Sequence, residues 1–420
     1  MLLPGADGSA SKGFRDGTHR VTDPAATVMR VSGLLPAFGI TRVANVTGLD
    51  HVGVPVVVVC RPNARSLSVS QGKGATIMAA RASGLMESIE SWHAERIAQP
   101  LRLASWNELR SAGRTADCAT LPQLSVSRFR TDLRILWIEG HDVAAGEPAW
   151  VPHELVHLDL TLPLPEGSGC FPLSSNGLAS GNHLLEAAVH GVCEVIERDA
   201  YALWYVSSEP RRDAMRLDLS SVTDPGCRDL IDRFDHAGML TGAWNITTDV
   251  RVPAFRCTII DRETDPFRPL YPSSGLGCHP AREVALYRAL IECAQSRLTR
   301  ISSSRDDVPR SDYELTRNPD YLESIRAALR DVVARRRFED APTHDAPTLD
   351  DDLQWLVGRL ADAGLSSVII VDLTHPGIGI PVVRAVIPGL ETKPAAAGWL
   401  PGERARRASV DGPSTGDTPS

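Results

Sequence analysis

The sequence predicts an α/β fold in which three related strand–turn–helix units pack around one common site. Three observations support this. A helix-forming pattern with acidic residues on one face occurs three times, about 100 residues apart. A short turn of small residues precedes each pattern, and strand-forming segments precede the turns. The separation is too long for a solenoid repeat, so we expect the units to surround one centre.

The central copy, residues 181–200, has two unlike faces when it is drawn as an α-helix. With Glu186 at 0° and ~100° per residue, Glu197 falls at about 20° and Glu194 at about 80°. The opposite face carries only apolar side chains: Leu184, Leu185, Ala188, Val189, Val192, Val195 and Ile196. A solvated acidic face is the ordinary alternative for one helix. Recurrence of the pattern favours carboxylates that face a common site instead.

The other two copies repeat the spacing of the first. An acid stands thirteen residues after the end of each turn, and another oxygen-bearing side chain follows three residues later. The resulting pairs are Glu87 and Glu90, Glu194 and Glu197, and Glu292 and Gln295. A spacing of three keeps both side chains on one face of a helix, so each copy offers two neighbouring oxygen ligands.

Inward-facing carboxylates require a cationic partner, because burying an unpaired one costs on the order of several kcal/mol. Hard oxygen ligands suit Mg²⁺ or Ca²⁺, and Mg²⁺ usually accompanies phosphate groups. The same elements carry Lys73, Arg198, Arg297 and Arg305, which suit phosphate oxygens. Turns at helix starts add free amides for anions. The pattern therefore predicts a magnesium–nucleotide site, although neither a Walker A motif nor Gly-x-Ser-x-Gly occurs.

Several of these segments closely resemble the YcaO family. They are residues 182–199, residues 83–90, residues 295–297 followed by 304–307, and residues 371–374 running on to 380–384. The resemblance covers residues 12–391, and the paired-acid helices are specific to it. It implies a YcaO-like fold in which the three units surround one central nucleotide site.

The resemblance also implies a chemistry, with ATP and Mg²⁺ as cofactors. YcaO-like enzymes activate the carbonyl oxygen of a peptide bond by phosphorylation. A Cys, Ser or Thr side chain then attacks to give an azoline, or external sulfide attacks to give a thioamide. The implied Mg²⁺ ligands are Glu87, Glu90, Glu186, Glu194 and Glu197. The implied nucleotide contacts are Lys12, Asn182, Arg198 and Arg297, to which residue chemistry adds Lys73, Gln295 and Arg305. Glu292 joins Arg198 and Arg297 as a catalytic candidate.

One departure bears on the product. Azoline-forming members commonly end in a Pro-x-Pro-x-Pro run, whereas residues 410–420 contain none. Residues 41–50 and 61–65 also look like the members that work with a TfuA-type partner and are linked to thioamide formation. We therefore expect thioamidation of a ribosomal precursor peptide or protein, with a TfuA-like partner. An azoline-forming cyclodehydratase is the alternative within enzymes. A non-catalytic peptide-binding scaffold is the alternative of another class, and the intact acid pairs argue against it.

Composition excludes several other classes. The net charge of −8 gives no basic excess for nucleic acid. Eight cysteines without a C-x-x-C pair predict neither zinc nor a disulfide framework, which fits a reducing cytoplasm. Residues 1–18 lack the pattern of a signal peptide, and the longest apolar run, residues 54–60, is too short to span a membrane. The choice between monomer and homodimer stays open.

We expect residues 1–10 and 393–420 to be disordered and residues 11–392 to form one catalytic domain of interleaved subdomains. Lys12, Arg15 and Arg20 form a basic group that serves either as a solvated tail or as a clamp over the nucleotide. Alternating or β-branched residues predict strands over 42–46 and 54–60 and an edge strand over 66–70.

Further along, a helix with a surface loop is expected over 102–120, and a hairpin joins 133–139 to 148–151. A Pro/Gly-rich loop over 163–172 precedes the central copy. A helix over 230–237, strands over 240–246 and 253–261 and a turn at Ser273 lead to the third copy. The arginines of 326–337 predict a solvated helical face, with peptide docking as the alternative. Residues 368–373 and 382–387 predict a β-pair.

Overall fold

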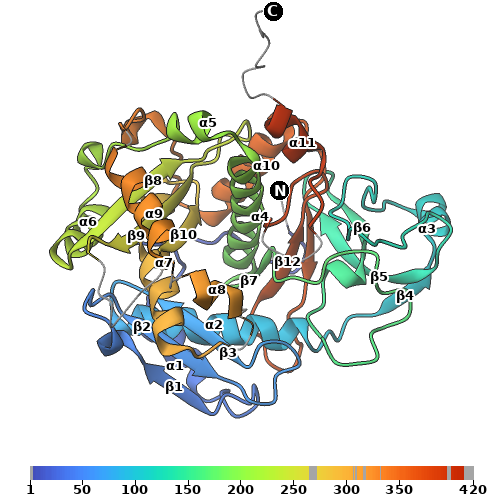
Figure 1. The fold of residues 1–420 in the computed structure, drawn as a ribbon. Helices are drawn as coiled ribbons and strands as arrows, with labels where there is room; N and C mark the ends of the chain where they lie inside the picture. Colours follow the sequence, from blue (N-terminus) through green and yellow to red (C-terminus); the bar gives the residue numbers. More distant parts are fainter. Residues whose placement is uncertain are drawn as a thin grey trace, which may run out of the picture.

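The computed structural model describes residues 3–263, 272–305, 307, 310–315, 318–331, 333–394 and 399–410, which form a mixed α/β fold (Figure 1). The helices are α1 Pro24–Ser32, α2 Ile77–Ala94, α3 Trp106–Ala112, α4 Leu184–Val206, α5 Glu209–Asp213, α6 Pro225–His236, α7 Arg282–Ser302, α8 Arg310–Leu315, α9 Pro319–Asp331, α10 Leu349–Asp362 and α11 Glu403–Val410. The strands are β1 Arg42–Asn45, β2 Val56–Cys60, β3 Val69–Lys73, β4 Leu101–Ala104, β5 Ile135–Asp142, β6 Glu147–Pro152, β7 Leu178–Ser180, β8 Met239–Asn245, β9 Ala254–Asp261, β10 Ser273–Cys278, β11 Ile369–Asp372 and β12 Val382–Val386.

The described strands form three antiparallel sheets. Two are three-stranded, with orders β1-β2-β3 and β10-β9-β8. The third has the order β4-β5-β11-β12-β7, and β6 pairs with β5. The last strand before each of the three acid-bearing helices lies at the edge of a sheet, so that β3, β7 and β10 lead into α2, α4 and α7. The three predicted strand–turn–helix units are thus present.

Glycines let the strands approach these helices closely. A Cβ on Gly72 of β3 would lie 2.0 Å from the carbonyl oxygen of Ala80 in α2. A Cβ on Gly277 of β10 would lie 2.1 Å from the carbonyl oxygen of Ala285 in α7. Since any side chain would push strand and helix apart, glycine fixes the same close packing in the first and third units.

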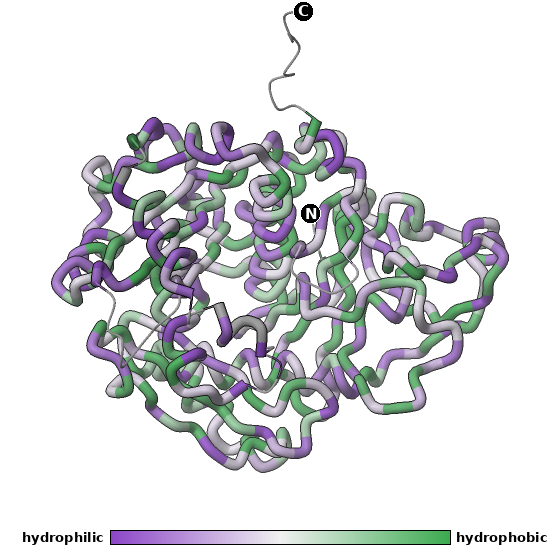
Figure 2. The backbone as a smooth tube through the Cα atoms, in the orientation of Figure 1, coloured by the Kyte–Doolittle hydropathy of each residue, from purple (hydrophilic) through white to green (hydrophobic). Residues whose placement is uncertain are grey.

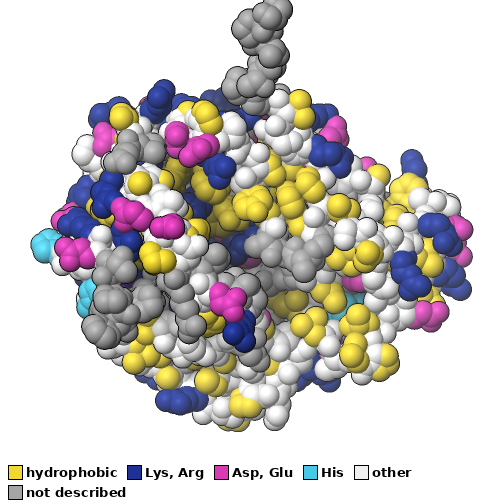
Figure 3. Space-filling view, viewed as in Figure 1, with side chains coloured by type: hydrophobic (Ala, Val, Ile, Leu, Met, Phe, Trp, Pro, Cys, Tyr) yellow, Lys and Arg dark blue, Asp and Glu magenta, His cyan; other side chains and the backbone are white. Residues whose placement is uncertain are grey.

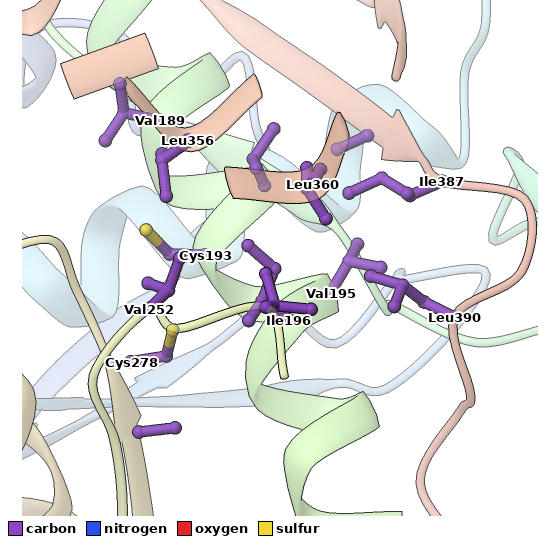
Figure 4. Packing of buried hydrophobic residues seen from close by; sticks show 14 of the residues in the cluster. Val189, Cys193, Val195, Ile196, Val252, Cys278, Leu356, Leu360, Ile387 and Leu390 are labelled. Atoms are coloured by element: carbon purple, nitrogen blue, oxygen red, sulfur yellow. The ribbon is translucent and has the colours of Figure 1, made fainter. Parts of the chain in front are cut away.

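The central helix α4 is buried on its apolar side, as its sequence predicts. All seven apolar side chains of that face are buried. Figure 4 shows Val195 and Ile196 among Leu360 of α10 and Ile387 and Leu390, which follow β12. In Figure 2, α4 stands in the middle of the molecule and carries both hydrophobic and hydrophilic residues. The apolar side thus anchors α4 and leaves its acidic side for the site.

Most of the other predicted elements are present with small shifts of their ends. The hairpin is β5–β6, the final β-pair is β11–β12, and the helix over 230–237 is the second half of α6. The turn predicted at Ser273 is wrong, because this residue begins β10 and pairs with Ile259. The low strand propensity of Ser273–Cys278 is overridden by its hydrogen bonds to β9. The predicted edge strand lies three residues further on, as β3.

Both ends of the described chain pack against the fold. Leu3 and Ala10 are buried, and Ser11 forms a β-bridge with Thr348. Within the segment expected to be a disordered tail, α11 buries Ala405 and Ala408. Hydrophobic contacts and polar pairs with distant segments hold residues 3–11 and α11 in place, and composition alone does not reveal such contacts.

The arginine-rich stretch is only partly solvated. Arg326 of α9 is buried, and its Nε donates to the carbonyl oxygen of Asp261 at 2.9 Å. The expectation of a fully solvated helical face is therefore wrong at this residue. No helix in the described part of the chain is both long and apolar enough to cross a membrane.

Candidate active site

Five carboxylates from the three acid-bearing helices meet at one place. They are Glu87 and Glu90 of α2, Glu194 and Glu197 of α4, and Glu292 of α7. Their charges act on one another across the helices. Glu194 repels Glu87, Glu90 and Glu197, and Glu292 repels Glu197. Figure 3 shows a hollow on this face, near the position of α4 in Figure 1, with basic side chains visible inside it.

The two acids of α2 have strongly raised pKa values. Burial raises the pKa of Glu90 to about 8, with repulsion by Glu87 and Glu194 adding to it. The backbone N–H and the hydroxyl of Ser180 donate to Glu90 at 2.9 and 2.7 Å and only partly offset this. Burial likewise raises the pKa of Glu87 to about 7, although Lys73 and Arg305 oppose the shift. Both acids therefore favour the protonated form near neutral pH when no cation is bound.

Lys73 and Arg198 compensate part of the negative charge of Glu194, Glu197 and Glu292. The Nζ of Lys73, at the end of β3, lies 2.7 Å from an oxygen of Glu292. The guanidinium of Arg198 lies 3.1 Å from Glu197 and 3.5 Å from Glu194. Burial alone would raise the pKa of Glu292, but Lys73 and Arg198 together hold it at about 2. About a fifth of the Lys73 and Arg198 side chains stays exposed, 20% of each, so a ligand can reach the cations from the hollow.

The donor set fits Mg²⁺ that is shared with phosphate oxygens. Mg²⁺ commonly binds one or two carboxylates, several waters and the phosphates of a nucleotide. In the part of the chain described, these five glutamates do not bring three ligand oxygens within 4.8 Å of one another. The pairs thus lack the close grouping of an all-protein metal cage. Burial disfavours the charged form of Glu87 and Glu90, and bound divalent ions would favour it.

Glu186, also predicted as a metal ligand, lies apart from the five and faces a second hollow. It is buried and accepts hydrogen bonds from the backbone N–H groups of Val21 and Asn182, at 2.7 and 3.2 Å. The guanidinium of Arg20 lies 3.4 Å from the same carboxylate. The hollow has an empty volume of about 310 Å³ and is lined by Thr18, His19, Arg20, Glu186, Val189, His190, Cys193, Cys278, His279, Arg288 and Leu349.

Lys12 lies beside this hollow and is fully buried. Its Nζ lies 2.7 Å from Asp352, and the side chains of His19 and His279 stand close to the same carboxylate. Burial, together with the charge of Lys12, lowers the pKa of His19 to about 4. His19, His279 and Asp352 form the only grouping of metal-ligand type within the described residues, and the ammonium of Lys12 already supplies positive charge there.

The other predicted contact residues lie as follows. Asn182 donates from Nδ2 to the hydroxyl of Thr27 at 2.9 Å, and Gln295 donates to the carbonyl oxygen of Gln71 at 2.7 Å. Arg305 donates to Asp307 at 2.8 Å and acts on Glu87. Arg297 is buried, with its guanidinium 2.8 Å from both Asp50 and Asp261. Arg297 is therefore held by two carboxylates outside the acid cluster.

Sequence reasoning missed two polar residues that shape the site, Ser180 and Arg288, and it left the role of Arg20 open. Ser180 holds Glu90, Arg20 holds Glu186, and Arg288 donates to Nε2 of His190 at 3.1 Å and acts on Glu197 and Glu292. Arg288 stands four residues before Glu292, so helical spacing could have placed it on the acidic face. Ser180 gives no such signal, and nothing in the sequence pairs Arg20 with Glu186, because only the tertiary fold brings these residues to their partners.

Comparison with known proteins identifies the family to which this chain is similar and solved structures with the same fold. The family model described as YcaO cyclodehydratase, ATP- and Mg²⁺-binding, matches residues 71–391. An uncharacterised protein in the tfuA 3′ region of Rhizobium leguminosarum bv. trifolii is 36% identical over 391 residues, covering 91% of each chain. An uncharacterised protein of Methanothermobacter thermautotrophicus is 32% identical, covering 88% of this chain and 94% of the relative.

Two solved structures share the fold. The YcaO protein from Methanopyrus kandleri bound with AMPPCP and Mg²⁺ matches with a TM-score of 0.72 and 23% identity, covering 91% of this chain and 95% of the other. A heterocyclase in complex with substrate and cofactor also matches with a TM-score of 0.72 and 23% identity. There the match covers 92% of this chain and 54% of the heterocyclase.

Proposed function

Since this chain belongs to the YcaO family, with ATP and Mg²⁺ as its cofactors, we propose that it converts a backbone amide of a peptide to a thioamide. The observation that carries the proposal is the convergence of five acids from three separate units, with Lys73 and Arg198 among them. Membership of the family alone already indicates an ATP-dependent enzyme of the cyclodehydratase type.

Each group of the cluster has a role in this proposal. Glu87, Glu90, Glu194 and Glu197 hold Mg²⁺, which when bound neutralises charge on the phosphates. Lys73 and Arg198 meet the phosphate oxygens, and Glu292 keeps Lys73 in place through the 2.7 Å ion pair. The remaining predicted contacts, Lys12, Asn182, Glu186, Gln295, Arg297 and Arg305, surround the cluster or brace the helices that form it. The protein contributes position and charge, which is what phosphoryl transfer requires.

The proposed reaction has two steps, phosphorylation of the amide oxygen and attack by hydrosulfide. The amide oxygen takes the terminal phosphoryl group of ATP, and ADP leaves while the amide nitrogen loses its proton. Hydrosulfide then attacks the amide carbon and forms the C–S bond. The C–O bond breaks with phosphate as the leaving group, sulfur loses its proton as C=S forms, and the nitrogen regains a proton. An otherwise unreactive amide is thereby made an electrophile.

The choice of thioamide over azoline rests on one observation. The relative in the tfuA 3′ region matches across nine-tenths of both chains, which supports a TfuA-like partner for this chain too. An azoline-forming cyclodehydratase acting on Cys, Ser or Thr is the second candidate, which the fold match to a heterocyclase favours. We propose a precursor peptide or protein as substrate in either case.

The variant Glu197→Gln tests the site. Loss of one charged ligand removes an interaction worth about 1.5–3 kcal/mol, so we expect Mg²⁺–ATP to bind at least about tenfold more weakly, as measured by calorimetry. Glu147→Gln, at an exposed position of β6, is the matched control and should bind as the wild type does. Wild-type affinity in Glu197→Gln would refute the assignment.

Mass spectrometry of the product separates the two candidates. Incubation of the peptide with Mg²⁺–ATP, sulfide and the partner should exchange one oxygen for sulfur. Loss of water from a Cys, Ser or Thr residue would instead identify the azoline-forming reaction.

A further inference from the structure

A buried arginine next to the acid cluster has no charged partner. Arg384 of β12 is 2% exposed, and its Nη2 donates to the carbonyl oxygen of Ser174. Its Nε and Nη1 are buried and have no hydrogen-bond partner in the described part of the chain. No carboxylate of a described residue lies within ion-pair distance of the guanidinium. A buried, unpaired cation is costly, and an anion would relieve that cost.

Arg384 lines a recess that could hold such an anion. The recess has an empty volume of about 400 Å³, part of it open to solvent. Its wall is mostly apolar, with Leu121, Pro122, Leu155, Pro172, Val195, Ala385, Val386, Ile387 and Leu390. Asn176 also lines it, and its Oδ1 is buried without a partner among the described residues. The recess thus presents unused N–H donors and one unused oxygen acceptor within an apolar wall.

The recess borders the candidate active site. Val195 in its wall directly follows Glu194, and the charge of Glu194 acts on Arg384. Thr392 also lines the recess, and the next residue, Lys393, interacts electrostatically with Arg198, Glu292 and Glu197. An anion held by Arg384 would therefore stand beside the place where the activated amide is proposed to form.

We propose that Arg384 and Asn176 form a binding site for the hydrosulfide ion that attacks the activated amide. This inference rests on the proposed thioamidation. A mostly apolar wall disfavours a strongly hydrated anion such as phosphate, because its lost hydration is not replaced. The guanidinium is itself weakly hydrated, which suits a soft monoanion. Hydrosulfide accepts the free N–H groups of Arg384 through sulfur and donates its S–H to Asn176, so it uses both unpaired groups.

Anomalous diffraction can locate the anion directly, with bromide as the probe. Crystals of the full chain soaked in sodium bromide should show a peak in the recess beside Arg384, and sodium hydrosulfide in the soak should displace it. Arg384→Met should remove the peak, since it keeps an apolar stem without the charge. The variant should stay folded, because deleting an unpaired buried charge removes a cost. Arg81→Met, at an exposed position of α2, is the control and should keep the peak.

A kinetic readout links the site to the reaction. In Arg384→Met the KM for sulfide should rise at least tenfold while the KM for ATP stays within twofold of the wild-type value. A peak that hydrosulfide does not displace, or an unchanged KM for sulfide, would mean an adventitious ion only and would overturn the inference. Thioamide formation with an empty recess would overturn it and leave the proposed function standing. An azoline product would overturn both.

Discussion

At the scale of single residues, near neighbours decide which glutamates of the cluster are charged. Glu292 has Lys73 at 2.7 Å and a pKa of about 2, whereas burial raises the pKa of Glu90 to about 8. Both lie on helices of related units. The difference arises because Lys73 forms an ion pair with Glu292, whereas only the hydrogen bonds from Ser180 offset the burial of Glu90. One cluster therefore holds both charged and protonated carboxyl groups near neutral pH.

The variant Lys73→Met tests this account. Lys73 exerts the largest attraction on Glu292, so its loss should raise the pKa of Glu292 above about 2, as followed by NMR titration of carboxyl carbons in labelled protein. Lys73→Arg keeps the charge and should leave the pKa low. An unchanged pKa in Lys73→Met would show that Arg198 alone suffices.

Sequence could identify the acids because helical spacing repeats in three places. It could not identify Arg384 as an unpaired cation, because the absence of a partner depends on which segments surround it. The partners of Ser180 and Arg20 were missed for the same reason: each residue meets its carboxylate only through tertiary structure.

At the scale of elements, helix α11 shows how a polar pair orders a segment that composition predicts as disordered. Arg404 of α11 lies 2.9 Å from Asp199 of α4, whose side chain is fully buried, and it also pairs with Asp249. Burial raises the pKa of Asp199 to about 6, and Arg404 opposes that shift. The three acid-bearing helices were predictable from residue spacing. The packing of α11 was not, because its partners lie about 150 and 200 residues earlier in the chain.

Removal of Arg404 should therefore destabilise the fold. Arg404→Met leaves Asp199 buried without its partner, which we expect to cost about 3 kcal/mol in the free energy of unfolding, measured with urea. The loss should be smaller at pH 5 than at pH 8, because Asp199 can be protonated at the lower pH. The double variant Arg404→Met, Asp199→Asn should recover part of the loss. A single variant as stable as the wild type would show that the pair contributes nothing.

At the scale of the whole molecule, the cluster couples stability to pH and metal. The pKa values of Glu87 and Glu90 rise from 4.5 to about 7 and about 8 in the folded chain. The folded state then binds more protons than the unfolded one between pH 4.5 and about 8. The contribution of these two groups to the stability of the metal-free protein is thus fully present below pH 4.5 and is lost as pH rises toward 8.

We expect Mg²⁺ with a non-hydrolysable ATP analogue to counter this loss, because the ions bind the deprotonated acids. Thermal unfolding from pH 5 to pH 8.5 should show a growing increase in Tm on adding the complex. In the variant Glu87→Gln, Glu90→Gln the metal-free protein should lose less stability over the same range. A wild-type slope in that variant would assign the pH dependence to other groups.

The attachment of the first residues to a late part of the chain has a consequence for biosynthesis. Ser11 pairs with Thr348, Lys12 with Asp352 and Arg15 with Asp345. A ribosome must therefore translate beyond residue 345 before residues 11–15 have their docking partners. By then the three acid-bearing helices have all been synthesised, so attachment of this segment comes after the helices of the acid cluster are available.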